Sequence, residues 1–450
     1  MKKVLGFVFL QLIVLQSVFC QNTKTGIISG HPAWIMQGNI YEVNVRQYTP
    51  EGTFNAFAKH LDRLKQMGAQ TLWFMPINPI SKVDRKGTLG SYYAVSDYTA
   101  INPEFGSLAD WKQLVKTIHS KGMKVIIDWV PNHTGADNRW LTEHPDFFVK
   151  DSSGKAAVMF DWTDTRQLDY RNPVMQDSMM AAMKYWITNT GIDGFRCDVA
   201  WNVPGSFWSK CIGQLKKMKN IFMLAEGDSA YLPKNGFDAV YPWHMFHMME
   251  KVAKGERPAF ALDSVRNEIN TVYPSNTLQM YFTSNHDENS WNKADFGSFP
   301  GPVHAHFAVF SQTMAKGVPL IYSGQEEPIL RAIPFFEKDT ITFSKLRRAS
   351  FYKTLLALRK RNEALSPDAA FKKVNVGDSS AVYAYIRAKA GKRVFVILNF
   401  SNKEQTIKVQ DKTLFGNPVN VFAGTKEPLS SKEWMIEPWG YTVYEYNPAK

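Results

Sequence analysis

The chain has 450 residues, which is enough for two or three domains and a large core. Hydrophobic residues make up 44% and charged residues 21%, as in ordinary globular proteins, whereas the aromatic fraction of 14% is high. The net charge of +12 comes from scattered basic residues without a basic run interleaved with aromatics, so we expect no nucleic-acid partner.

Residues 1–20 are predicted to be a signal peptide. Two lysines precede an apolar run over residues 4–14, and a polar segment follows Cys20. We expect cleavage after Cys20 and a secreted or periplasmic protein. Lipid attachment to Cys20 is the alternative, which the bulky Phe19 disfavours. No later apolar run is long enough for a transmembrane helix. The sequence carries no signal for an oligomeric state.

Eight strand–helix units follow, from about residue 39 to 365. Apolar strands that alternate with amphipathic helices predict an α/β protein with a parallel sheet, and eight units predict a closed (β/α)8 barrel, the TIM barrel, over residues 25–365. An open doubly wound sheet is disfavoured, because no Gly-rich turn follows the first strand. The predicted strands are residues 39–48, 71–76, 124–130, 194–200, 221–226, 237–241, 277–284 and 318–322.

Two regions depart from this repeat. Residues 133–172 form a long insertion after the third strand, rich in Asp, Gly and Ser, and we interpret it as an excursion domain. From residue 366 to 450 the pattern changes to short alternating stretches, which predict a C-terminal antiparallel β-sandwich.

The fourth predicted strand carries two charged residues, Arg196 and Asp198, inside an apolar run. Alternation along a strand places residues two apart on the same face, so guanidinium and carboxylate are expected to meet. A structural ion pair would explain the two residues in isolation. Bare buried charges are costly, however, so a functional role is the other interpretation.

Further polar residues follow the other predicted strands. Asp128 and His133 end the third, Glu226 ends the fifth, and His286 and Asp287 end the seventh. In a TIM barrel these ends meet at one face, where active sites lie. The two histidines stand singly, without the paired spacing of a transition-metal centre. Three facing carboxylates favour glycosidic bond cleavage, which needs one carboxyl group to protonate the leaving oxygen and another to stabilise or attack the anomeric carbon.

The stretches DWVPNH, GFRCDVA, LAEGD and TSNHDE, at these strand ends and in this order, strongly resemble the four motif regions of the alpha-amylase family, glycoside hydrolase family 13. Further resemblances are GSYYAVSDY, QLDYRNP and GVPLIYSGQE. The resemblance covers about residues 35–445, and the barrel, the excursion and the C-terminal sandwich match the family's layout.

The resemblance implies a retaining hydrolase of α-1,4-glucosidic bonds in starch-like glucans or maltooligosaccharides, without an organic cofactor. Asp198 would be the nucleophile, Glu226 the general acid and base, and Asp287 the third catalytic carboxylate. Because two anions about 5 Å apart resist joint ionisation, we expect a raised pKa for Glu226. The substrate-binding residues implied by the resemblance, or proposed as stacking platforms, are Arg196, His133, His286, Tyr93, Asp128 and Trp201.

Asn132 and Asp169 match positions that often hold a structural calcium ion in the family. Oxygen ligands suit this hard cation. The sequence departs from many members at Trp201 and Asn202, where a Lys-His pair completes the calcium site and lines the next subsite. Calcium occupancy and the sugar contacts beyond the scissile bond are therefore left open, and Trp201 is predicted either to stack on a sugar or to pack.

Other functions are compatible with parts of this pattern. An α-glucosidase or a glucan transglycosylase of the same family would use the same carboxylates. A glucan-binding protein with the same fold and no catalysis is disfavoured, since Asp198, Glu226 and Asp287 are all present. A sugar isomerase or aldolase would need a Schiff-base lysine or metal ligands at the strand ends, and neither is found there.

Overall fold

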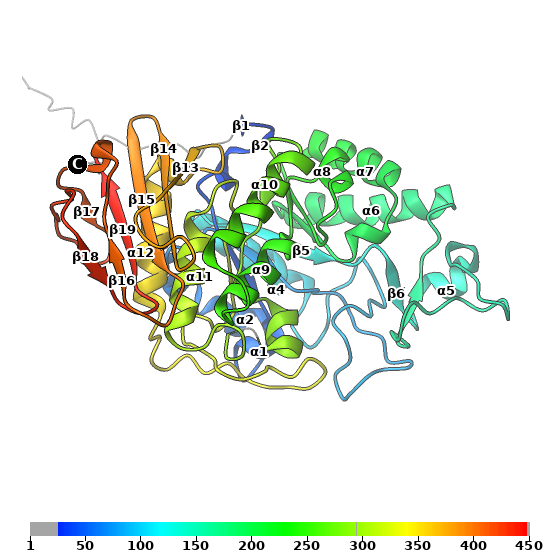
Figure 1. The fold of residues 1–450 in the computed structure, drawn as a ribbon. Helices are drawn as coiled ribbons and strands as arrows, with labels where there is room; N and C mark the ends of the chain where they lie inside the picture. Colours follow the sequence, from blue (N-terminus) through cyan, green and yellow to red (C-terminus); the bar gives the residue numbers. More distant parts are fainter. Residues whose placement is uncertain (1–25, 294, 448–450) are drawn as a thin grey trace, which may run out of the picture.

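A barrel of eight parallel strands forms the centre of the molecule (Figure 1). The computed structural model describes residues 26–293 and 295–447. Hydrogen bonds from Val318 N–H to Gln279 C=O (2.9 Å) and from Leu320 N–H to Tyr281 C=O (2.8 Å) close the sheet into a barrel between β11 (Leu278–Gln279) and β12 (Leu320–Tyr322). In order around the barrel the strands are β3 (Ile40–Val43), β4 (Thr71–Phe74), β5 (Lys124–Trp129), β8 (Gly194–Cys197), β9 (Phe222–Ala225), β10 (Ala239–Val240), β11 (Leu278–Gln279) and β12 (Leu320–Tyr322).

Helices surround the barrel because each turns an apolar stripe toward the sheet. In α4 (Leu108–Ser120) the stripe includes Trp111 and Leu114, and a reciprocal capping box of Ser107 and Asp110 starts the helix. The other helices of the barrel are α2 (Phe54–Ala58), α3 (Leu61–Met67), α6 (Pro173–Thr190), α7 (Gly205–Met218), α8 (Tyr231–Lys234), α9 (Trp243–Ala253), α10 (Leu262–Val272), α11 (Pro302–Thr313) and α12 (Ala349–Arg361).

The predicted strand over residues 39–48 is too long. Strand β3 ends at Val43, and the chain turns into a short helix, α1 (Val45–Tyr48). Tyr48 packs edge-on against Phe57 of α2, with ring centroids 4.7 Å apart. This apolar contact outside the barrel stabilises the helix in place of further strand pairing. The fourth strand, predicted to extend to residue 200, also ends early, at Cys197. The next two residues, Asp198 and Val199, line a cavity instead of continuing the strand.

The excursion after β5 projects from one side of the barrel (Figure 1). Its hairpin pairs β6 (His133–Gly135) with β7 (Thr165–Gln167), and the connection contains α5 (Trp140–Glu143). Trp140 packs edge-on against Phe147 at 5.5 Å, which gives the excursion a small apolar core. The hairpin thereby carries polar residues over the C-terminal ends of the barrel strands.

An antiparallel sheet lies on the opposite side, coloured orange and red in Figure 1. Buried Arg387 fastens it to the barrel by donating hydrogen bonds to Thr313 C=O and Ser366 C=O, both at 2.7 Å. Strands β16 (Gln405–Ile407) and β18 (Trp434–Ile436) form a separate pair. The five-stranded sheet runs in the order β13 (Ala370–Val374), β14 (Val382–Lys389), β15 (Lys392–Asn399), β19 (Tyr441–Tyr446) and β17 (Val419–Asn420).

The predicted signal peptide over residues 1–20, with Cys20, lies outside the described residues. A short antiparallel pair, β1 (Ile27–Ile28) and β2 (His31–Pro32), precedes the barrel. In the described part of the chain no helix is both long and apolar enough to cross a membrane. Cys197 and Cys211 are buried free thiols.

Candidate active site

A cavity of about 580 Å³ opens at the C-terminal ends of the barrel strands. It is lined by the side chains of the three predicted catalytic carboxylates, which come from the ends of β8, β9 and β11. Three further predicted site residues line it as well: Tyr93, His133 and His286. The barrel therefore brings together groups that lie up to about 200 residues apart in the sequence.

Arg196 is the centre of the polar network. Its side chain is fully buried, and its Nη1 lies 2.8 Å from Asp128 Oδ1 and 3.0 Å from Asp198 Oδ1. Its Nη2 lies 3.2 Å from Glu226 Oε1. The predicted meeting of Arg196 and Asp198 on one strand face is confirmed, and the guanidinium orients two of the three carboxylates that line the cavity.

The backbone after Asp198 also serves the site. Val199 has φ of 45°, in the left-handed region that a β-branched residue rarely adopts. In this conformation its N–H donates a hydrogen bond of 2.6 Å to Glu226 Oε2. The strained turn thereby ties Glu226 to the strand that carries Asp198.

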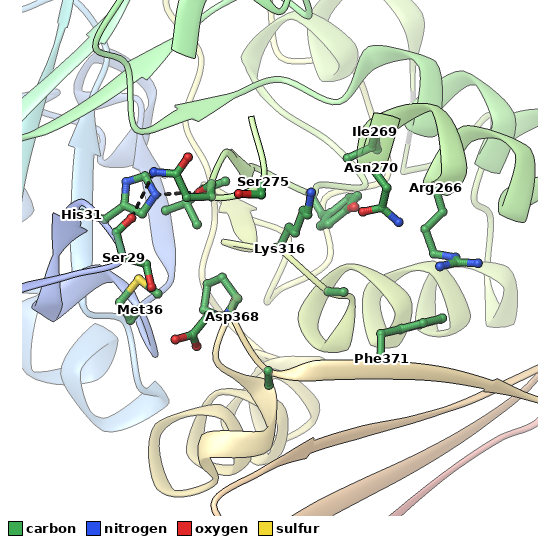
Figure 2. A pocket seen from close by; sticks show the side chains of 16 residues that line it. Ser29, His31, Met36, Arg266, Ile269, Asn270, Ser275, Lys316, Asp368 and Phe371 are labelled. Atoms are coloured by element: carbon green, nitrogen blue, oxygen red, sulfur yellow. Dashed lines mark hydrogen bonds between the residues drawn. The ribbon is translucent and has the colours of Figure 1, made fainter. Parts of the chain in front are cut away.

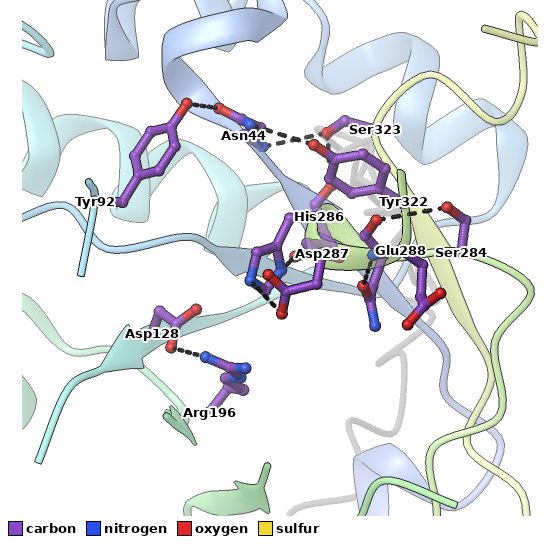
Figure 3. Close-up of polar contacts among 12 residues, drawn as sticks. Asn44, Tyr92, Asp128, Arg196, Ser284, His286, Asp287, Glu288, Tyr322 and Ser323 are labelled. Carbon is purple, nitrogen blue, oxygen red and sulfur yellow. Dashed lines mark hydrogen bonds and ion pairs between the residues drawn. The ribbon is translucent and has the colours of Figure 1, made fainter. Parts of the chain in front are cut away.

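A second network holds the remaining carboxylate (Figure 3). His286 Nε2 lies 3.3 Å from Asp287 Oδ2, as Figure 3 shows. The same nitrogen lies 2.7 Å from the Tyr93 hydroxyl. On the other side of the imidazole, Nδ1 lies 2.6 Å from Glu42 Oε1. Tyr93 in turn donates to Asp128 Oδ2 at 3.0 Å, so the two networks share Asp128.

Burial beside Glu226 raises the pKa of Asp198 well above its usual range. Burial also acts to raise the pKa of Glu226, but Arg196 and the Val199 N–H outweigh it, and the Glu226 pKa is lowered. The expected rise of the Glu226 pKa is therefore wrong for this structure. The neighbouring Asp198 also acts to lower the pKa of Glu226, so the groups around this pair of carboxyls favour a proton on Asp198 over one on Glu226.

The two histidines differ in charge. Burial lowers the pKa of His133 to about 4, so its imidazole is neutral at pH 7. Burial would lower the pKa of His286 too, but the carboxylates of Asp287 and Glu42 outweigh it and raise that pKa to about 9. His286 is therefore an imidazolium at neutral pH and balances part of the negative charge in the cavity.

Three predicted substrate-binding residues lie away from the cavity surface, and the fully buried Arg196 is one of them. Asp128 is fully buried, and it contacts Arg196 and Tyr93 from below. Trp201 is 45% exposed and is absent from the cavity lining. Its side chain lies next to Gly227, where an added Cβ would be 3.2 Å from Trp201 Cβ.

Several residues in the site were missed by sequence reasoning. Glu42 is fully buried near the end of β3. It could have been found in the same way as Arg196, because it too is a charged residue inside an apolar strand. The cavity also has aromatic walls, and Tyr93 stacks on Phe335 at 6.2 Å with 14° between the rings. The other aromatic members of the lining are Trp162, Trp291 and Phe336.

The residues at the implied calcium site do not fit a calcium ion. Asn132 Oδ1 accepts a hydrogen bond of 2.8 Å from Asn202, and the soft sulfur of Met159 lies 3.2 Å from Asn132 Nδ2. Both oxygens of Asp169 face the Arg171 guanidinium, at 2.7 to 3.1 Å. A hard cation requires several free oxygen ligands, whereas these oxygens already have partners.

A second cavity, of about 420 Å³, lies at the N-terminal ends of the strands, between α10 and the start of β13 (Figure 2). Asp368 is the one acidic residue among the described residues that line it. That carboxylate accepts a hydrogen bond of 2.6 Å from Lys389. A single paired carboxylate cannot perform the two-carboxylate chemistry of the first cavity.

Comparisons with known proteins agree with this geometry. The family model described as the alpha-amylase catalytic domain matches residues 17–163 and 157–350, and the model of the alpha-amylase SusG C-terminal domain matches residues 382–439. The alpha-amylase MalA of Haloarcula japonica is 26% identical over 399 residues, which cover 84% of this chain. The match covers 57% of MalA, so this chain spans less than two thirds of that relative.

Two solved structures are similar over almost their whole length. The noncanonic maltogenic alpha-amylase AmyB of Thermotoga neapolitana has a TM-score of 0.83 at 26% identity, covering 91% of this chain and 99% of AmyB. An alpha-amylase of Lactobacillus plantarum has a TM-score of 0.82 at 27% identity, covering 92% and 99%. With its catalytic barrel and its C-terminal sheet both matched, this chain belongs to the alpha-amylase family of glycoside hydrolases.

Proposed function

We propose that the protein is a secreted, retaining hydrolase of α-1,4-glucosidic bonds in starch-like glucans or maltooligosaccharides. One observation carries the proposal: Asp198, Glu226 and Asp287 line one cavity at the C-terminal strand ends, and Arg196 contacts the first two. The aromatic walls suit a ligand with flat apolar faces, such as a pyranose ring. Secretion rests on the predicted signal peptide over residues 1–20.

In the first step, a carboxylate oxygen of Asp198 attacks the anomeric carbon. The bond between that carbon and the glycosidic oxygen breaks, and its electron pair stays on the oxygen, which takes a proton from Glu226. A covalent glycosyl-enzyme forms, and the leaving sugar departs. In the second step Glu226 removes a proton from water, whose oxygen displaces Asp198 and restores the α configuration.

The proton must therefore move from Asp198 to Glu226 when substrate binds. A sugar bound at the site comes between the two groups. The positive charge that develops at the anomeric carbon favours an ionised Asp198, which Arg196 stabilises by its contact of 3.0 Å. In the reacting complex the proton therefore lies on Glu226 and Asp198 is ionised.

The remaining residues position the sugar. Asp287 would accept hydrogen bonds from sugar hydroxyls, held in place by the charged His286 and, behind it, by Glu42. Neutral His133 can donate and accept hydrogen bonds at the cavity wall, and the Tyr93 ring offers a stacking platform. Trp201 remains a candidate for sugar contact outside the cavity. No step requires calcium or an organic cofactor.

The test follows the anomeric protons of products by NMR during turnover of maltooligosaccharides, starch, pullulan, sucrose and trehalose. We expect α-configured products from maltooligosaccharides and starch. Transfer products longer than the substrate would support the glucan transglycosylase alternative, and glucose as the sole product would support an α-glucosidase. Initial β-configured products would contradict the role of Asp198, and no turnover of any α-glucoside would favour a binding protein.

A further inference from the structure

One wall of the cavity is made by a loop that is fastened to two other segments. The loop comprises residues 84–89, between β4 and α4, and we call it the rim loop. Lys86 Nζ donates a hydrogen bond of 2.8 Å to Asp161 C=O of the excursion. Beside it, Arg166 Nη2 of the excursion lies 2.7 Å from Asp84 Oδ2. Lys86 and Asp161 both line the cavity, so this connection forms part of its wall.

The other end of the rim loop is fastened to the segment that follows β12. Leu89 N–H donates to Phe336 C=O at 3.0 Å, and Thr88 N–H donates to Glu337 Oε1 at 2.9 Å. Just before these two residues, Gly87 has φ of +61°, and a Cβ added there would lie 2.6 Å from Phe336 Cβ. The two segments are thus in close contact, and the wall is continuous from the excursion to Phe336.

Buried Arg46 supports this wall from below. Its guanidinium donates to Leu89 C=O at 3.1 Å, Gly90 C=O at 3.0 Å and Phe335 C=O at 3.3 Å. The guanidinium also lies 4.1 Å from the centre of the Tyr92 ring. One buried cation therefore joins the rim loop and the segment after β12, which argues that the wall is a built feature of the fold.

The strand order locates this wall relative to the proposed acid. Strand β9, which Glu226 follows, is separated from β3 by three strands in each direction around the barrel, so the two strands face each other. The rim loop follows β4 and Phe336 follows β12, the two neighbours of β3. The wall therefore stands across the cavity from Glu226.

The position of the wall across from Glu226 determines which end of a bound glucan faces it. The proposed acid protonates the oxygen of the leaving, reducing-end part of the chain, so that part lies on the Glu226 side. The retained part, which ends in the non-reducing terminus, then points at the wall. We propose that the rim loop closes the cleft at the non-reducing end, so that the enzyme releases short pieces from chain ends. This inference rests on the proposed function, and Lys86 is its specificity-determining residue.

The test compares two p-nitrophenyl maltoheptaosides. They differ only at the terminal non-reducing sugar, where O4 and O6 are either free or joined by an ethylidene acetal. Cleavage is followed by mass spectrometry of all products. Because a closed wall has no space for the acetal, we expect the free substrate to react at least about tenfold faster than the blocked one. The products should be short fragments of the non-reducing end.

Variants then test the wall itself. The double substitution Lys86→Ala with Arg166→Ala removes both side-chain connections to the excursion, and we expect faster cleavage of the blocked substrate. Lys82→Ala, at an exposed lysine just before the rim loop, should leave the ratio of the two rates unchanged. Equal rates for wild-type protein on both substrates would overturn the inference alone. No cleavage of either substrate would overturn the proposed function and this inference with it.

Discussion

The two ends of the barrel use buried carboxylates in opposite ways. At the N-terminal end, Asp193 lies just before β8, 2.7 Å from His119 Nε2 and 3.0 Å from Lys219 Nζ, and it accepts a hydrogen bond of 3.0 Å from Val125 N–H. At the C-terminal end five buried or partly buried carboxylates share one arginine and one charged histidine. These carboxylates are Glu42, Asp128, Asp198, Glu226 and Asp287.

The difference in charge balance separates stability from reactivity. Burial alone would raise the pKa of Asp193, but His119, Lys124 and Lys219 outweigh it and lower that pKa far below its usual range. Asp193 therefore stays ionised and joins neighbouring strands. At the other end there are too few cations, so a proton is retained between Asp198 and Glu226. A retained proton is what an acid catalyst needs.

The largest expected effect comes from Glu226→Gln, which removes the proton donor at the reactive end. We expect kcat on maltooligosaccharides to fall by about 10³-fold or more, since general acid catalysis contributes on this scale. The melting temperature should stay the same or rise, because the substitution relieves a surplus of negative charge. Steady-state kinetics and thermal unfolding measure both. Near-normal turnover of starch by this variant would refute the assignment of the acid.

Asp193→Asn, at the other end of the barrel, should lower stability and leave activity unchanged. We expect a loss of about 3 kcal/mol in the free energy of unfolding, because Lys124 and Lys219 lose their carboxylate and His119 loses a close partner, with kcat/KM unchanged at a temperature where the variant is folded. Since the folded-state pKa is lowered, the stabilisation is present above about pH 4 and is lost as the pH falls further. Urea unfolding at several pH values tests this.

The control for that variant is Asp62→Asn, which removes an exposed carboxylate paired with Lys121. Exposed pairs contribute less than about 1 kcal/mol, so this substitution should change unfolding little. Equal destabilisation by the two variants would mean that burial of the Asp193 carboxylate is irrelevant to its effect.

A smaller effect is expected from Glu42→Gln, which changes the charge on His286 without touching the cavity. Below a pH of about 9 the wild-type imidazole is protonated and holds Asp287, so activity should decline as the pH rises through that value. Without the Glu42 carboxylate the pKa of His286 falls, and the alkaline limb of kcat/KM should move to lower pH. If the alkaline limb of kcat/KM does not move in this variant, the limb reports the Asp198–Glu226 pair and not His286.

The smallest effect is expected from metal removal. Because Asn132 and Asp169 already have Asn202 and Arg171 as partners, we expect a chelator to leave the melting temperature unchanged. Thermal unfolding with chelator and with added calcium measures this. A drop in melting temperature that calcium reverses would restore the calcium site to these residues.

Much of the fold and the site follows from local patterns in the sequence. The apolar strands and amphipathic helices predict the barrel, because each element must bury one face. The four motifs at the strand ends identify the three carboxylates, since a TIM barrel brings those ends to one face. The charge pair Arg196 and Asp198 was recognisable because alternation along a single strand is a local rule, and their contact of 3.0 Å confirms it.

Other features depended on residues that meet only in the folded chain. Glu42 reaches His286 across 244 positions of sequence, and the rim loop meets Glu337 across 249. The location of the shared proton depends on the distances of Arg196 and the Val199 N–H from Glu226, which no motif encodes. The sequence by itself determined the three carboxylates of the site, Arg196 and the two histidines. The tertiary structure decided their charges and the shape of the cleft, because electrostatic interactions and closure depend on distances through space.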